Sequence, residues 1–187
     1  MLFRRGDLKC LGLNVVINFL TQFQFNYNDI SFLSKDIQNC GLNNRISHHI
    51  SIKYLGYEDD LFPQKTQDIL DVLYKNRLKF NKKTIDIVGF DIMNLNNSYY
   101  KDHLYLKLEP ISYLNALHKS IISFLDGMID MFIMNDLKNF VPHISCGKIS
   151  DSRKIEFLNY QFNKHGTIHI DNWELVLHTS KQEFVII

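Results

Sequence analysis

Two short segments of the chain repeat one pattern, in which a histidine, an apolar residue, a serine and a second apolar residue follow one another. The first is residues 49–52, HISI, and the second is residues 143–146, HISC. Alternation of polar and apolar residues is typical of a strand with one buried face, because successive side chains of a strand point to opposite sides. We therefore expect two strands, each presenting an imidazole and a hydroxyl on one face and burying its apolar residues with the other.

The spacing His-x-Ser/Thr is common, and the chain contains three further matches, at residues 118–120, 165–167 and 178–180. The first lies in a helical pattern, where residues two apart do not share a face, and the second flanks a glycine turn. The third ends a predicted strand, but its middle residue is polar. The apolar context therefore favours His49 and His143 as the catalytic pair.

Hydrophobic periodicity predicts strands and helices over most of the chain. Strands are expected at residues 14–20, 49–55, 84–95, 103–108, 141–149, 167–170, 173–178 and 183–187, and helices at residues 29–39, 63–80, 110–127 and 151–158. Asn28 and Asp151 are expected to cap two of the helices, and Gly56 to end the second strand. Because the connections include both hairpins and crossovers, we predict an α+β fold with mainly antiparallel sheets around a central groove and helices packed on the outside.

Length and hydrophobic content set the number of domains. A chain of 187 residues with 45% hydrophobic residues can bury one sizeable core, so we predict a single domain over residues 1–187 that includes a candidate N-terminal extension at residues 1–12. Basic residues near the start precede an apolar run and loosely imitate a secretory signal. Asn14 and Asn18 interrupt that run, which favours an opening strand.

Charge and cysteine content narrow the classes of function. The formal net charge is +1, so the whole chain creates no field that would draw it onto nucleic acid or a membrane, and phosphate recognition has to be local. Cys10, Cys40 and Cys146 are odd in number and far apart, which argues against a disulfide framework and a thiolate zinc site. We expect a cytoplasmic protein, and no apolar stretch is long enough to span a bilayer.

Residues 49–56, HISIKYLG, and residues 140–148, FVPHISCGK, resemble the two signature motifs of the 2H phosphoesterases. The first motif of that family continues to an aromatic-Leu-Gly ending, and in the second a proline precedes the histidine and a basic residue follows five positions later. The similarity extends in order over about residues 13–187, with counterparts in the RNA ligase and cyclic-phosphodiesterase branches. It implies a two-lobed fold of that family.

The same resemblance assigns roles to the motif residues. His49 and His143 would be a paired general acid and base, in an order that the motifs leave open, and Ser51 and Ser145 would donate to the non-bridging phosphate oxygens. Both hydroxyl positions are serine where the family commonly has threonine, and Cys146 replaces a branched aliphatic residue. Serine keeps the donor but loses the methyl group that restricts the rotamer, so these departures bear on turnover more than on identity.

Four further residues are candidates for substrate binding. Lys53 shares the strand parity of His49, and contact with phosphate and a solvated charge are equal alternatives for it. Lys148 occupies the basic position of the second motif, but it has the wrong parity unless the strand bulges there. Tyr54 and Tyr57 are candidates for stacking on bases, with core packing as the alternative. Tyr99 and Tyr100 are weighed in the same way, and Trp173 is predicted to be core.

Imidazole titrates near neutral pH, so two imidazoles can remove a proton from the attacking oxygen and supply one to the leaving oxygen without a metal or another cofactor. We predict a monomeric, metal-independent phosphodiesterase that acts on RNA or oligonucleotides, with 2′,3′-cyclic phosphate ends or 2′,5′ linkages as substrates. A viral or phage enzyme that degrades cyclic or 2′,5′-linked immune signals is one alternative. A non-catalytic RNA or nucleotide-binding module is another, and a metal enzyme is a third, although no acidic residue accompanies either motif at ligand spacing.

Overall fold

The computed structural model describes residues 17–25, 30–42, 45–58, 63–93, 102–128, 140–178 and 183–187. Within these residues the strands form one eight-stranded sheet in the order β6-β3-β4-β5-β2-β1-β7-β8. Every pairing between the described strands is antiparallel. The strands are β1 (Ile17–Phe25), β2 (His49–Glu58), β3 (Ile85–Met93), β4 (His103–Glu109), β5 (His143–Lys148), β6 (Ile168–Ile170), β7 (Trp173–His178) and β8 (Glu183–Val185).

The sheet consists of two four-stranded halves that meet where β2 lies beside β5. At this junction one position is paired in register, Ile50 with Ile144, whereas the pairing of β1 with β2 and that of β3 with β4 extend over most of those strands. The sheet is therefore continuous, and its centre is a short ladder between strands that are distant in the sequence. This is an α+β fold, with one sheet in place of the separate sheets that we expected.

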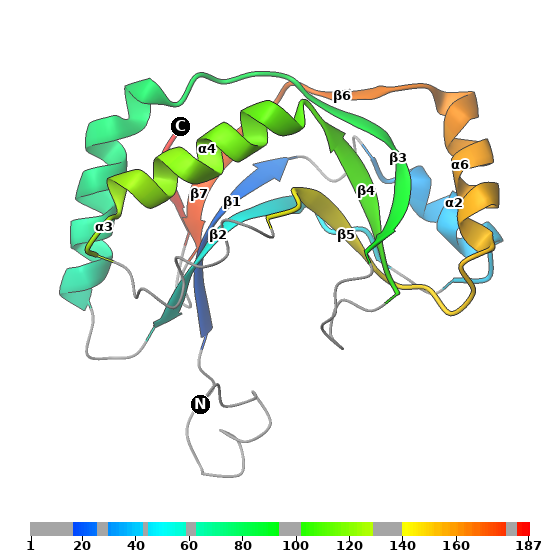
Figure 1. The fold of residues 1–187 in the computed structure, drawn as a ribbon, viewed down its shortest axis with the longest axis horizontal. Coiled ribbons are helices and arrows are strands. Elements are labelled where there is room, and N and C mark those ends of the chain that lie inside the picture. Colours follow the sequence, from blue (N-terminus) through cyan, green and yellow to red (C-terminus); the bar gives the residue numbers. More distant parts are fainter. Residues whose placement is uncertain are drawn as a thin grey trace, which may run out of the picture.

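The helices lie against the sheet at its centre and its two ends (Figure 1). Helix α4 (Ile111–Phe124) packs against β2 and β4, and α3 (Pro63–Asn76), which is followed by a 3-10 turn at Arg77–Lys79, packs against α4. At the β3 end of the sheet, α6 (Lys154–His165) packs against β3, and α2 (Leu33–Asn39) packs against α6. Helix α4 thus covers the face of the sheet on which the central strands bury their apolar residues.

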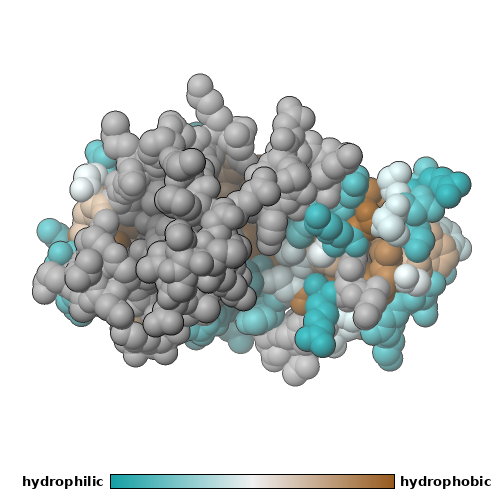
Figure 2. Space-filling view, turned by 90° about the horizontal axis from the view of Figure 1, so that it is seen from below, coloured by the Kyte–Doolittle hydropathy of each residue, from teal (hydrophilic) through white to brown (hydrophobic). Residues whose placement is uncertain are grey.

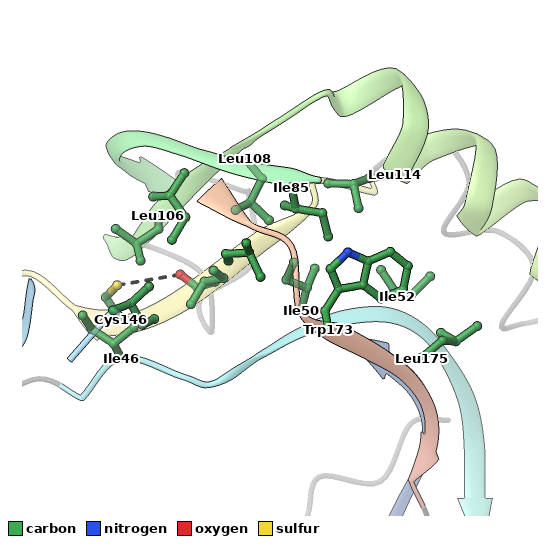
Figure 3. Close-up of a cluster of buried hydrophobic side chains, with 14 of the residues drawn as sticks. Ile46, Ile50, Ile52, Ile85, Leu106, Leu108, Leu114, Cys146, Trp173 and Leu175 are labelled. Carbon is green, nitrogen blue, oxygen red and sulfur yellow. Dashed lines mark hydrogen bonds between the residues drawn. The ribbon is translucent and has the colours of Figure 1, made fainter. Parts of the chain in front are cut away.

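The core fills the space between the sheet and its helices, and the part of it around Trp173 is drawn in Figure 3. Ile50, Leu106 and Ile144 have no exposed surface, as strand alternation predicted. Trp173 is 1% exposed, as predicted, and its indole N–H donates to the carbonyl of Lys83 at 2.8 Å. This bond satisfies the polar group that burial of the ring would otherwise leave without a partner.

Most of the predicted elements are present, with shifted ends. β1 runs beyond residue 20 to Phe25, and α6 runs to His165. The prediction that Gly56 ends a strand is wrong, because β2 continues to Glu58 across a register shift in its pairing with β1. Asp151 lies in the turn before α6, where its carboxylate accepts a hydrogen bond from the backbone N–H of Arg153 at 3.1 Å, but Arg153 holds the N-cap position of the helix and has no side-chain capping bond.

Three predictions about the N-terminal part concern, partly or wholly, residues that the structure does not describe. The extension at residues 1–12, the start of the opening strand and the capping residue Asn28 lie outside the described part of the chain. Helix α2 begins at Leu33, with Phe32 at its N-cap position and no side-chain capping bond there. Within the described ranges, no helix is both long enough and apolar enough to cross a bilayer.

Candidate active site

The two motif strands are neighbours, and their polar residues share a face. Ile50 and Ile144 pair across β2 and β5 and are fully buried under α4. Because side chains alternate along a strand, the residues on either side of these two isoleucines point to the opposite face of the sheet. His49, Ser51, His143 and Ser145 are therefore brought together on the face turned away from α4. Seen from below, the described residues form hydrophilic and hydrophobic patches side by side (Figure 2).

His143 is held by the chain that precedes it. Its Nδ1 lies 2.7 Å from the carbonyl oxygen of Val141. A carbonyl only accepts hydrogen bonds, so Nδ1 carries the proton, and in the neutral ring Nε2 is then the proton acceptor. Burial lowers the pKa of His143 from its ordinary value of 6.5, and the bond to Val141 opposes this in part. The result is a neutral imidazole at pH 7 with Nε2 able to take up a proton.

The ring of His49 is also held at Nδ1, but by a side-chain hydroxyl and not by a backbone carbonyl. Its Nδ1 lies 2.9 Å from the hydroxyl of Ser47, again two residues before the histidine. The backbone N–H of Ser47 donates to the carbonyl of Ser145 at 2.8 Å, which ties this support to the other motif strand. A hydroxyl can donate or accept, so Ser47 is compatible with both the neutral and the protonated form of His49.

A bulge in β5 decides where Lys148 lies. Tyr105 pairs with Ser145 but Leu104 pairs with Gly147, so Cys146 is an extra residue in β5. Gly147 has a φ of 90°, which L-residues with a side chain rarely adopt. Beyond the bulge, Lys148 is exposed and pairs with His103. The strand thus bulges at the point where the sequence required it for Lys148 to share the face of the motif residues.

A second register shift, in β2, has the reverse effect on Lys53. Thr21 pairs with Lys53 and Gln22 with Ser51, so Ile52 is an extra residue. Ile52 and Lys53 are 1% and 2% exposed, while Ser51 is exposed. The simple alternation used to place Lys53 beside His49 is interrupted here, and the alternative of a solvated charge is wrong because the side chain is buried.

The remaining candidates for substrate binding lie outside what the structure describes. The backbones of Tyr54 and Tyr57 belong to β2, but their side chains are not described, and Tyr99 and Tyr100 fall in the undescribed range 94–101. Of the other matches to the motif spacing, His118 is 2% exposed in α4 and stacks on Phe140 with ring centroids 4.1 Å apart. His118 therefore belongs to the packed layer above the sheet.

Two residues of β4 also lie at the site, although the sequence motifs did not point to them. His103 is 8% exposed, and its Nε2 lies 2.8 Å from the Ser145 hydroxyl. The rings of His103 and Tyr105 meet the His143 ring edge to face, with centroids 5.9 and 5.7 Å apart. Leu104, Leu106 and Leu108 occupy alternate positions of this strand, so alternation alone places His103 and Tyr105 on the face opposite the leucines.

The electrostatics of these two residues follow from burial and from their neighbours. Burial lowers the pKa of His103, and the nearby His143 and Lys148 lower it further. Burial raises the pKa of Tyr105, as do the charge of Asp91 and its hydrogen bond to the phenol. A neutral His103 and a protonated Tyr105 thus border His143. In the described ranges no three His, Cys, Asp or Glu side chains are grouped as metal ligands, and Cys40 and Cys146 are free thiols.

Comparison with known proteins gives structural matches only. No family model and no curated protein sequence matches the chain. TT0787 of Thermus thermophilus superposes with a TM-score of 0.53 at 10% identity, covering 91% of this chain and 98% of that one. The PDE domain of MHV ns2 superposes with a TM-score of 0.50 at 12% identity, covering 90% and 96%. The chain therefore has a fold like that of the 2H phosphoesterases, as the two motifs predicted.

Proposed function

We propose that the chain is a phosphodiesterase that hydrolyses RNA or oligonucleotide phosphodiesters, with His143 as the general base and His49 as the general acid. The observation that carries the proposal is the position of both motif histidines on one face of adjacent strands. In each of them Nδ1 is hydrogen-bonded to the residue two positions earlier in the chain. In such an arrangement the Nε2 edges are the ones that serve proton transfer. A structure named as a PDE domain has a similar fold, which supports the same reaction class.

The order of base and acid follows from the two supports. Val141 offers only an acceptor, so neutral His143 has its proton on Nδ1, and burial favours this neutral form. A base has to begin the reaction neutral and an acid has to begin it protonated. Ser47 accepts a hydrogen bond from a protonated His49 as readily as it donates to a neutral one. His143 is therefore the better base, and His49 is the partner that can start protonated.

The hydrolytic step requires only water as a co-reactant. His143 Nε2 takes a proton from water as the water oxygen bonds to phosphorus, and the bond from phosphorus to the leaving ester oxygen breaks. His49 gives its proton to that oxygen, which leaves as an alcohol. Ser51 and Ser145 donate hydrogen bonds to the non-bridging oxygens, where negative charge accumulates. Afterwards His143 loses its proton to solvent and His49 regains one.

Three substrate groups fit this chemistry: RNA with 2′,3′-cyclic phosphate ends, 2′,5′-linked oligonucleotides, and cyclic or 2′,5′-linked oligonucleotide signals of the kind that a viral enzyme would degrade. They differ beyond the scissile phosphate. The decisive screen offers 2′,3′-cyclic mononucleotides, cyclic-phosphate-ended RNA, 2′,5′-oligoadenylates and cyclic dinucleotides in the presence of a strong chelator, with products identified by mass.

The matched variants are His49→Ala, His143→Ala and the control His169→Ala, whose side chain is 62% exposed on the distant strand β6. Loss of an acid or base is expected to lower kcat by about 10²–10⁴, and the control is expected to leave it unchanged. A kcat close to that of the wild type in either motif variant contradicts the assignment. Binding of these nucleotides without turnover by the wild-type chain would favour a non-catalytic module instead.

A further inference from the structure

His103 is the one nearly buried histidine on the same face as the motif residues in the described part of the chain, and the two motifs do not include it. It lies at the start of β4, with Nε2 2.8 Å from Ser145 Oγ and its ring 5.9 Å from that of His143. On β5 its paired residue is Lys148, which the bulge brings to this face. A polar ring at this position shapes the hydrogen bonding of Ser145 before any substrate arrives.

The contact between His103 and Ser145 determines where the single proton of the Ser145 hydroxyl can be donated. A serine hydroxyl has one proton to donate. If that proton goes to His103 Nε2, the hydroxyl cannot also donate it to a phosphate oxygen. If Nε2–H donates to Ser145 Oγ, the serine proton is directed elsewhere and is available to a phosphate oxygen. The donor role proposed for Ser145 therefore requires the second arrangement.

We propose that His103 is a positioning residue: its Nε2–H donates to Ser145 Oγ and directs the serine hydroxyl proton at a non-bridging oxygen of the phosphodiester. The inference rests on the proposed function, because it deepens the role of Ser145 in that reaction. It also explains how a serine performs at a motif position where the methyl group of threonine would restrict the rotamer. In this chain a hydrogen bond from the neighbouring strand takes over that task.

A matched pair of variants separates positioning from packing. The amide nitrogen of glutamine reaches the place of histidine Nε2, whereas that of asparagine reaches only the place of Nδ1. We expect His103→Asn to lower kcat about tenfold, a part of what loss of a whole oxyanion donor costs. His103→Gln is expected to stay within about threefold of wild type because it restores the donor. If His103→Asn keeps the wild-type kcat, or if the two variants lose it equally, the inference is wrong.

A double-mutant cycle with Ser145→Ala adds the readout that a merely structural histidine would not give. Once the hydroxyl is absent, His103→Asn has nothing to position, so its effect on kcat should shrink to less than about twofold. Multiplicative losses in the double variant would overturn the inference. Thermal unfolding of each variant identifies any that fails to fold, and His103→Gln then provides the comparison.

Two measurements decide the inference even if the wild-type chain hydrolyses none of the substrates, an outcome that would defeat the proposed function alone. In ligand-free protein, ¹⁵N NMR of the histidine rings should show a protonated Nε2 on His103, and an unprotonated Nε2 overturns the proposal. In titrations with inorganic phosphate, His103→Asn and Ser145→Ala should weaken binding to a similar degree while His103→Gln does not. Equal affinity in all four proteins also overturns it.

Discussion

The two motif strands give their histidines the same position and different surroundings. On β2, His49 has a serine hydroxyl at Nδ1 and the ring of His48 at 5.7 Å. On β5, His143 has a backbone carbonyl at Nδ1 and lies against the rings of His103 and Tyr105. A carbonyl accepts only, while a hydroxyl works in both directions. The difference teaches that two similar motifs can place their histidines in unlike hydrogen-bonding environments, which is the asymmetry that the proposed base and acid require.

The largest difference between the two histidines is expected with a phosphodiester that carries an activated leaving group, such as a p-nitrophenyl ester. Such a leaving group departs without a proton, so the acid becomes dispensable while the base does not. We expect His143→Ala to lose about 10²–10⁴ in kcat on this substrate, as on a natural one, and His49→Ala to lose less than about tenfold. Steady-state kinetics on both substrates measures the difference. The reverse pattern would exchange the two roles.

A smaller effect is expected from the bulge that distinguishes β5. Gly147→Ala places a side chain at a φ of 90° and should destabilise the fold by about 1–3 kcal/mol. It should also lower activity beyond that cost, because Lys148 and Ser145 depend on the bulge for their positions. Gly127→Ala is the matched control, at a φ of 76° with open space around it. Equal activity in the two variants, compared at temperatures well below unfolding, would show that the bulge does not serve the site.

The supports themselves provide a finer test. Ser47→Ala removes the hydroxyl at His49 Nδ1, and we expect kcat/KM to fall about two- to tenfold, the worth of one hydrogen bond. Val141→Ala leaves the carbonyl behind His143 in place, and it trims a side chain that is already 37% exposed. No change is expected there. A drop of the same size in both variants would mean that general packing, and not the hydroxyl, is responsible.

The smallest effect is on stability. The pKa values of His143 and His103 are lowered in the folded chain, so the unfolded chain binds more protons once the pH falls below about 6.5. Stability should therefore be independent of these two groups above pH 7 and should decline as the pH falls from about 6.5 toward 5. Urea unfolding at a series of pH values measures this. In His143→Gln the decline should be shallower than in wild type, and an identical slope would contradict the desolvation of that ring.

The sequence predicted the parts of this fold that depend on local pattern. Alternation around Ile50 and Ile144 predicted both motif strands and the face of their histidines, because burial of one face imposes a period of two. The same rule failed at Lys53, because a register shift depends on the partner strand β1, which a local pattern does not contain. The contact of His103 with Ser145 was missed for a related reason: it joins residues 42 apart, and only the pairing of β4 with β5 brings them together.

The junction of the two half-sheets has a consequence for how the chain acquires its structure. Ile50 and Ile144, which meet there, are separated by 94 positions (144 − 50), and β1 in the other half pairs with β7 from the opposite end of the chain. Contacts of such long range form slowly, because the intervening loop has to be closed before they stabilise anything. The two histidines therefore depend on contacts of this long range to come together, and during synthesis His49 cannot meet His143 until β5 has emerged from the ribosome.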